Sequence, residues 1–172
     1  MKLPSIIAQD NLDSLAKTAA DSVEGCFVEV GVFEGGSAQI LYDIAMAQGR
    51  RIFLYDTFNG IPYSDTVDSH KVGDFTYKDV EYISRALPKA IVTQGIFPDS
   101  AIEMPPIAFC HLDVDQYWSY RNALDYLETK ISPGGIIWFD DYGCTSGCDM
   151  ALNERYGKGT LEMCGQKYYK RF

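Results

Sequence analysis

The sequence predicts a doubly wound α/β fold with a mostly parallel, seven-stranded sheet that an antiparallel hairpin closes. Short runs rich in β-branched and aromatic residues alternate along the chain with segments whose apolar residues recur at helical spacing. The run at 136–139 is apolar throughout, which is typical of a strand covered on both faces. Alternation of this kind favours parallel strands joined by crossover helices.

The first part of the chain predicts a βαβ unit. A leading helix within residues 1–25 precedes a strand at 26–30, and a helical pattern at 38–46 precedes a second strand at 51–55. A strand, a helix and a strand within about 30 residues require a crossover between parallel strands.

The second part continues the alternation after a long polar segment. Residues 57–75 are rich in Gly, Pro, Asp and Ser, and a loop of this length predicts a lid or a binding loop. The elements expected beyond it are a helix at 77–87, strands at 90–93 and 107–112, a helix at 117–127, a turn at 132–135, a strand at 136–139, a helix at 150–156, and a hairpin of 160–164 with 167–171. We expect a single domain over residues 1–172.

Composition excludes several classes of partner. The chain has 15 Lys and Arg against 24 Asp and Glu, a formal net charge of −9, which disfavours nucleic acid and anionic membrane surfaces. No apolar run approaches the roughly 20 residues that span a bilayer. Gln9, Asp10 and Asn11 interrupt the apolar stretch that a signal peptide needs, so we expect a cytoplasmic protein.

A glycine-rich turn follows the first strand. Gly31, Gly35 and Gly36 form a G-x-x-x-G-G pattern that lacks the middle glycine of the dinucleotide-binding motif. Phe33 stands where bare backbone would have to approach a pyrophosphate, so dinucleotide binding is disfavoured. A P-loop is excluded because no Gly-Lys-Ser/Thr follows. Taken alone, the glycines also fit a simple tight turn between strand and helix.

Two acids near this turn indicate the ligand. Asp56 comes 20 residues after Gly36, at a strand end suited to accept hydrogen bonds from two ribose hydroxyls. Glu29 lies in an apolar strand, where a cationic ligand group would offset the cost of its burial. A nucleoside with a charged tail and no phosphates describes S-adenosylmethionine, whose carboxylate we expect at the helix N-terminus that begins at Ser37.

Four further carboxylates follow two strands. Asp113 and Asp115 come after the strand at 107–112, and Asp140 and Asp141 come after the strand at 136–139. Crowded carboxylates raise one another's pKa unless a cation neutralises them, and hard oxygen ligands select Mg²⁺. The alternative is that Asp115 and Asp141 are helix N-caps.

These segments resemble the macrocin O-methyltransferase family of class I S-adenosylmethionine-dependent enzymes, which have a Rossmann-like methyltransferase fold. Some members methylate sugar hydroxyls in antibiotic pathways. The matching motifs run in order from about residue 26 to 143, and the D-T-F-x-G-I-P and L-D-x-D-x-Y motifs are the more specific. They are Phe27–Gly31 with Ser37, Asp56–Pro62, Gly95–Asp99, Leu112–Tyr117, Pro133–Gly135 and Asp140–Gly143.

The resemblance implies a role for individual residues. The methionine end of the cofactor would contact Glu29, Gly31, Phe33, Gly35 and Ser37, with Asp113 nearby; the ribose would contact Asp56; and the adenine would lie between Thr57, Phe58, Gly95, Ile96 and Phe97. Mg²⁺ would be held by Asp113, Asp140 and Asp141, with Asp115 as a fourth candidate. Asp113 is the expected general base; His111 is the lesser candidate, with packing in the core as its alternative. Further candidates for the pocket wall are Tyr63, His70, Tyr77, Tyr117 and Trp118.

We therefore predict an S-adenosylmethionine-dependent, Mg²⁺-assisted O-methyltransferase acting on a hydroxyl of a small polar acceptor such as a sugar or a natural product. The alternatives are a metal-independent small-molecule methyltransferase and a non-catalytic S-adenosylmethionine-binding module. The chain looks shorter than family members with elaborated N-terminal and lid segments. Its pocket is therefore expected to be open, to be completed by a second subunit in a homo-oligomer, or to select a different acceptor.

Overall fold

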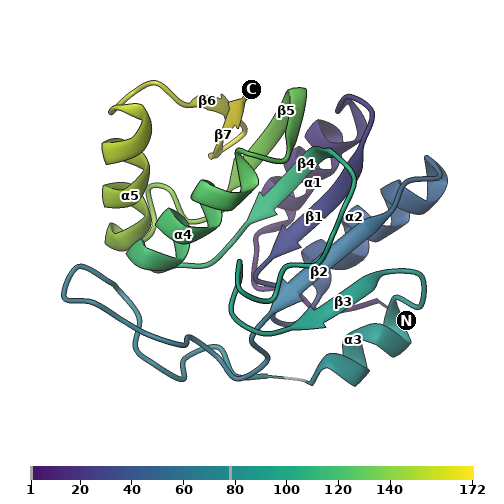
Figure 1. Ribbon diagram of the computed structural model, residues 1–172, viewed down its shortest axis with the longest axis horizontal. Helices are drawn as coiled ribbons and strands as arrows, with labels where there is room; N and C mark the ends of the chain where they lie inside the picture. The colour runs from purple at the N-terminus through teal and green to yellow at the C-terminus, as the bar shows by residue number, and fades with distance from the viewer. Residues whose placement is uncertain (1, 78) are drawn as a thin grey trace.

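Seven strands form one sheet in the order β3-β2-β1-β4-β5-β7-β6 (Figure 1). The computed structural model describes residues 2–77 and 79–172. The strands are β1 (Cys26–Val30), β2 (Ile52–Asp56), β3 (Ile91–Gln94), β4 (Ile107–Leu112), β5 (Ile131–Phe139), β6 (Glu162–Cys164) and β7 (Lys167–Arg171). The helices are α1 (Gln9–Ala20), α2 (Gly36–Ala47), α3 (Val80–Ala86), α4 (Tyr117–Leu127) and α5 (Ser146–Tyr156).

The strand order contains one topological switch point. β1 pairs in parallel with both β2 and β4, so the chain leaves β1 toward one edge of the sheet and later returns to its other side. β3 and β5 extend the parallel part, and β7 pairs antiparallel with β5 and β6. The predicted doubly wound fold with a closing hairpin is confirmed, and ligands of such sheets bind beyond the strand ends at the switch point.

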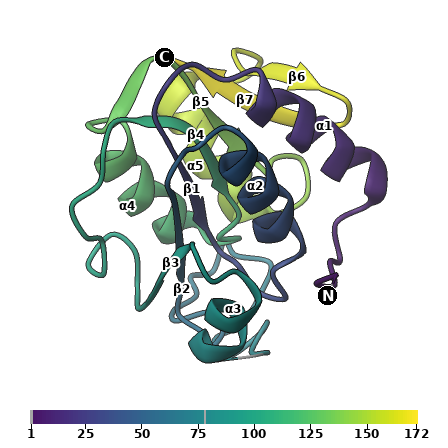
Figure 2. The same ribbon diagram turned by 90° about the vertical axis from the view of Figure 1, so that its right-hand side faces the viewer.

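Helices cover both faces of the sheet (Figure 2). Alternate residues of each strand point to opposite faces, as in β2, where Ile52 and Leu54 join the core beneath α1, α2 and α3. Phe53 and Tyr55 join the core beneath α4 and α5. Fully burying one such side chain contributes roughly 1.5–3 kcal/mol to folding, so these two apolar layers hold the strand ends in fixed positions.

Several element bounds differ from the prediction, and the largest differences are at α3, α5 and β5. α3 begins at Val80, because Asp79 caps it by accepting a hydrogen bond from the Tyr82 amide at 2.9 Å. α5 begins at Ser146, four residues before the expected start. The predicted turn at 132–135 is wrong: it lies inside β5, as an irregularity where the register with β4 shifts. The C-terminus stabilises it, since Gly135 accepts a backbone hydrogen bond from Phe172 at 3.0 Å.

Residues 57–75 form a long loop that is docked on the carboxyl edge of the sheet, at the lower left of Figure 1. The Asp68 carboxylate accepts a hydrogen bond from the first amide of α4, at Tyr117, at 2.7 Å. Ser69 accepts one from the Ser146 amide of α5 at 3.2 Å. The loop is therefore fixed to the N-terminal ends of both helices. Among the described residues 2–77 and 79–172, no helix is long and apolar enough to cross a membrane.

Candidate active site

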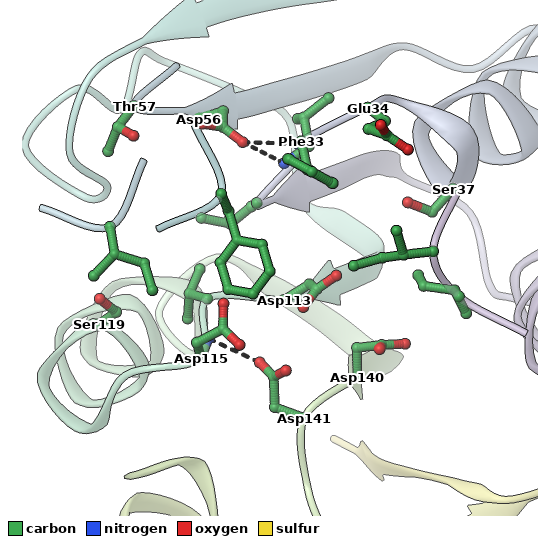
Figure 3. Close-up of a pocket in the computed structure, with 18 of the residues that line it drawn as sticks. Phe33, Glu34, Ser37, Asp56, Thr57, Asp113, Asp115, Ser119, Asp140 and Asp141 are labelled. Carbon is green, nitrogen blue, oxygen red and sulfur yellow. Dashed lines mark hydrogen bonds between the residues drawn. The ribbon is translucent and has the colours of Figure 1, made fainter. Parts of the chain in front are cut away.

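A cavity of about 470 Å³ opens beyond the carboxyl ends of β1, β2, β4 and β5 (Figure 3). Residues 57–75 contribute one wall through Thr57, His70 and Phe75, and the N-terminal residues 4–8 contribute another. Of the other predicted wall residues, Tyr63, Tyr77, Tyr117 and Trp118 are not among the lining residues of the described chain. The cavity therefore occupies the switch point where the fold predicts a ligand.

The glycine turn brings β1 and β4 together on the cavity floor. Gly31 has a φ of +90°, and a Cβ built on it would lie 1.7 Å from the Asp113 carbonyl oxygen. Only glycine permits this approach, in which the Asp113 amide donates to the Val30 carbonyl at 2.9 Å. Gly35 has a left-handed backbone and is the N-cap residue of α2, whose N-terminus has no side-chain cap. With Ser37 also lining the cavity, this uncapped N-terminus suits an anionic group.

Asp56 fixes the turn as well as lining the cavity. Its Oδ2 accepts hydrogen bonds from the Val32 amide at 2.7 Å and from the Phe33 amide at 2.9 Å (Figure 3). Its Oδ1 accepts one from the Phe58 amide at 2.7 Å. A carboxylate offers about four acceptor positions, so limited capacity remains for the predicted ribose contact. The sequence indicated a ligand role for Asp56 but not this structural one.

The residues expected around the adenine divide into two groups. Thr57, Gly95, Ile96 and Phe97 line the cavity. Phe58 does not, and packs instead in the core beneath α1, α2 and α3. Ile96 is 41% exposed and offers an apolar surface at the cavity mouth, as a flat nucleobase requires.

Glu29 and His111 form a buried pair that does not line the cavity. They occupy register positions on β1 and β4, and His111 Nδ1 lies 2.8 Å from Glu29 Oε1. Both side chains are 0% exposed. We expected a cationic group of a ligand beside Glu29, but the His111 side chain occupies that position. Glu29 Oε2 has no hydrogen-bond partner among the described residues.

The surroundings of His111 favour its charged form. Burial opposes its protonated form, but the Asp140 and Glu29 carboxylates outweigh burial and raise the pKa of His111 to about 10. A buried imidazolium has no lone pair with which to accept a proton, so this geometry does not favour His111 as the general base.

Three of the four predicted carboxylates converge. One ligand oxygen from each of Asp113, Asp115 and Asp141 lies within 4.8 Å of the others. Figure 3 shows these three side chains turned toward one another. Burial and then the neighbouring Asp141 raise the pKa of Asp115 to about 8, and burial and the same crowding raise that of Asp113. Burial also raises the pKa of Asp141, although the Asp115 amide and the Tyr120 hydroxyl donate to it, each at 2.8 Å.

The fourth carboxylate, Asp140, faces away from this group. Its Oδ2 accepts from Lys167 Nζ at 2.9 Å, and its Oδ1 lies 3.5 Å from His111 Nε2. Burial disfavours the Asp140 carboxylate, but these two cationic partners outweigh burial and lower its pKa. The structure therefore groups Asp115, rather than Asp140, with Asp113 and Asp141.

The converging carboxylates fit a hard divalent cation. They supply oxygen donors, and the structure shows no cationic side chain within ion-pair distance of Asp113 or Asp141 in the described chain. The alternative assignment as helix N-caps is wrong for both helices, because Gln116 occupies that position in α4 and Thr145 occupies it in α5. The carboxylate that accepts a hydrogen bond from the first turn of α4 belongs to Asp68, in the loop at 57–75.

Lys167 and residues 4–8 contribute to the site although no sequence pattern indicated them. Lys167 lines the cavity from the first position of β7, beside the end of β5. Its position depends on the antiparallel register of β7 with β5, in which Phe139 pairs with Tyr168, and no local pattern reveals that register. Residues 4–8 reach the cavity because Leu3 and Ser5 pack on the glycine turn at Gly35 and Gly36.

The fold and the site define an α/β domain with a nucleoside-sized cavity at its switch point and a group of carboxylates beside it. The sequence model of the family described as macrocin-O-methyltransferase (TylF) matches residues 7–161. The chain belongs to this family, which confirms the resemblance inferred from its motifs.

Two relatives agree with this assignment, and one solved structure shows the same fold. The chain is 31% identical to the 8-demethyl-8-(2,3-dimethoxy-alpha-L-rhamnosyl)-tetracenomycin-C 4'-O-methyltransferase of Streptomyces olivaceus, over 87% of this chain and 65% of that protein. It is 26% identical to the mycinamicin III 3''-O-methyltransferase of Micromonospora griseorubida, over 84% and 66%. The structure of the O-methyltransferase NovP matches with a TM-score of 0.85 at 22% identity, over 97% of this chain and 81% of that one. The chain thus spans slightly less than two thirds of the length of these two relatives.

Proposed function

We propose that the protein is an S-adenosylmethionine-dependent O-methyltransferase that acts on a hydroxyl of a small polar acceptor, such as the sugar of a natural product, with the assistance of Mg²⁺. The observation that carries the proposal is the position of three converging carboxylates beside the cavity at the switch point, in a member of this family. The names of both relatives specify O-methylation, and that of the Streptomyces protein includes a rhamnosyl group, which supports a sugar as the acceptor.

The protein's own residues would hold and orient the methyl donor. S-adenosylmethionine supplies a methyl group on a sulfonium, from which an acceptor oxygen can displace it. The turn that Asp56 fixes would carry the nucleoside, and the uncapped N-terminus of α2 at Ser37 would face the carboxylate of the methionine end. Holding donor and acceptor in line removes much of the entropy cost of the transfer.

Asp113 is the proposed proton acceptor. Its carboxylate lines the cavity at the end of β4, where it would reach a hydroxyl group bound in the cavity. When bound beside it, Mg²⁺ lowers the pKa of a hydroxyl. The acceptor oxygen forms a bond to the methyl carbon as the bond from that carbon to sulfur breaks. The products are a methyl ether, S-adenosylhomocysteine and a proton held by Asp113.

The loop at 57–75 and residues 4–8 would restrict water. Phe33 packs edge-on against Phe75, with ring centroids 5.7 Å apart, and His70 packs against the same ring at 4.8 Å. This group of aromatic rings lies between the glycine turn and the loop and forms part of the cavity wall.

A metal-independent methyltransferase is the second candidate. One observation favours it: the site already holds the positive charges of Lys167 and His111, on either side of Asp140. Those charges are directed at Asp140 rather than at the three converging carboxylates, so we place this candidate second.

The test is transfer of a labelled methyl group from S-adenosylmethionine to a panel of rhamnosylated, aminoglycosidic and phenolic acceptors. We expect transfer to at least one glycoside and loss of that transfer in EDTA, with recovery when Mg²⁺ is added. Transfer that is unchanged by EDTA selects the metal-independent candidate. Binding of the donor without transfer to any acceptor selects the non-catalytic module.

A further inference from the structure

The side chain of Gln116 is directed away from the helix that it precedes. Gln116 is the N-cap residue of α4, but its side chain makes no capping hydrogen bond. It is 0% exposed, and its Nε2 donates to the backbone carbonyl oxygens of Tyr63 at 3.3 Å and His70 at 3.1 Å. An N-cap side chain ordinarily accepts hydrogen bonds from the first amides of its own helix. Gln116 instead holds the loop at 57–75.

The loop supplies the cap that Gln116 does not. Asp68 Oδ1 accepts a hydrogen bond from the Tyr117 amide at 2.7 Å, and its Oδ2 accepts one from the Asp65 amide at 2.7 Å. A Cβ built on Gly147, in the first turn of α5, would lie 2.1 Å from Asp68 Oδ1. Glycine at this position therefore admits the carboxylate between the two helices. The loop and α4 thus exchange side chains: Gln116 holds the loop, and Asp68 caps the helix.

This exchange places His70 at the cavity. Gln116 fixes the main chain of His70, whose side chain lines the cavity and packs against the Phe75 ring with centroids 4.8 Å apart. His70 Nε2 lies 3.5 Å from Asp115 Oδ1. Asp115 is grouped with Asp113, beside which the proposed function places the acceptor hydroxyl. The fixed part of the loop therefore forms the acceptor side of the cavity.

Polar contacts, rather than apolar packing, hold this part of the loop. None of residues 62–75 is buried. Beyond Gln116 and Asp68, hydrogen bonds to the loop come from Ser146 and Trp118, which are both exposed. Water competes for hydrogen bonds at exposed positions, so the bonds from the buried Gln116 amide contribute most to holding the loop.

From this exchange we propose that Gln116 is a positioning residue that fixes the loop at 57–75 against α4 and thereby sets the affinity for the acceptor but not for the donor. The inference rests on the proposed function, because it assumes an acceptor beside Asp113. Gln116 does not line the cavity of the described chain, so it acts through the loop. Without its two hydrogen bonds, His70 and Phe75 would lose their fixed positions. An acceptor would then have to order the loop as it binds, which lowers its affinity.

Hydrogen–deuterium exchange of the full chain without ligands measures how firmly the loop is held. Gln116→Met keeps the length of the side chain but removes the donor, so we expect amides within residues 63–74 to exchange about tenfold faster. Gln94→Met is the matched control, since Gln94 also donates to a loop carbonyl, that of Thr57 at 3.1 Å, but from an exposed position. It should leave exchange at 63–74 within about twofold. Asp68→Ala removes the other half of the exchange and should match Gln116→Met, which keeps the inference testable where Gln116→Met fails to fold.

Steady-state kinetics separate the acceptor from the donor. The acceptor is p-nitrophenyl α-L-rhamnoside, or in its place the panel acceptor that the wild type methylates fastest. We expect Gln116→Met to raise the KM for the acceptor about tenfold, and to leave kcat and the KM for S-adenosylmethionine within about threefold. A residue with only a structural role would lower kcat through loss of folded protein and leave both KM values unchanged.

Two results would overturn the inference alone. One is unchanged exchange at 63–74 in folded Gln116→Met or Asp68→Ala, and the other is an acceptor KM that is unchanged or that rises no more than the donor KM. Absence of transfer from the wild type to every acceptor contradicts the proposed function, and the inference falls with it.

Discussion

The carboxylates of Asp113, Asp115 and Asp141 lie closer together than their charges favour. Burial removes the water that would screen them, so each disfavours ionisation of the next, and all three have a raised pKa. Asp140 shows the opposite behaviour a single residue away, because Lys167 and His111 face its two oxygens. Adjacent aspartates thus have pKa shifts of opposite direction, because cationic partners outweigh burial only at Asp140.

Asp113→Asn tests the proposed base. The amide keeps the shape of the side chain but has no basic oxygen, so we expect methyl transfer to fall by about 10²–10⁴-fold. Affinity for S-adenosylhomocysteine should change by less than about threefold, since the donor makes its main contacts elsewhere. Transfer rates and calorimetric titration check the two quantities. Asp99→Asn, at an exposed position outside the cavity lining, is the control and should retain both. Full activity of Asp113→Asn would remove Asp113 from the mechanism.

At the scale of elements, most of the fold follows from local pattern. The bounds of β1 and α4 equal the predicted ones, because glycines flank β1 and the apolar residues of α4 recur at helical spacing. The turn expected at 132–135 became part of β5, since pairing with the C-terminal Phe172 overrides the local preference of Pro and Gly. The acids at the ends of β4 and β5 could be predicted as site residues, because each follows an apolar run directly. Lys167 and residues 4–8 could not, because their place at the site depends on the register of β7 and on packing across the glycine turn.

Gly31→Ala tests how the turn joins β1 to β4. The new Cβ would meet the Asp113 carbonyl at 1.7 Å in addition to the strain of a φ of +90°. Gly159→Ala is the matched control, with a φ of +79° and nothing within 4 Å of the new Cβ. We expect the control to lower the free energy of unfolding by about 1–2 kcal/mol, and Gly31→Ala to lower it by at least about 2 kcal/mol more. Denaturant titration measures both, and equal losses would show that the close approach is not a constraint.

At the scale of the whole molecule, the site is built at some cost to stability. Buried charges and crowded acids remain at the carboxyl edge of a sheet whose strands are otherwise apolar, and the whole chain carries a net charge of −9. The chain spans 65% of the length of the Streptomyces relative, and the cavity is walled by the loop at 57–75 and by residues 4–8. Completion of the cavity by a second subunit stays a prediction, as do the expected single domain and the cytoplasmic location.

The pH dependence of stability follows from two raised pKa values. The folded chain raises the pKa of His111 from 6.5 to about 10, so the stabilisation from its charge is complete below pH 6.5 and is lost as the pH rises toward 10. The raised pKa of Asp115, about 8 in place of 3.8, acts in the same direction up to pH 8, because only the folded chain holds that proton. We therefore expect the free energy of unfolding in EDTA to fall between pH 6.5 and 10.

Denaturant titration at pH 6.5, 8 and 9.5 measures this trend. His111→Gln should show a flatter dependence above pH 8, because the charged group that titrates there is gone. Stability that is constant or that rises across this range in the wild type would contradict the charge state assigned to His111.

The account depends most directly on the cavity being the site of the methyl donor. Calorimetric titration with S-adenosylhomocysteine, with and without Mg²⁺, tests this. We expect one binding site per chain. Binding should be lost in Asp56→Ala, which removes the acceptor of the Val32, Phe33 and Phe58 amides. The control variant Asp43→Ala, on the exposed surface of α2, should bind as the wild type does. No binding of S-adenosylhomocysteine to the wild type under either condition would contradict the proposed function at its first step.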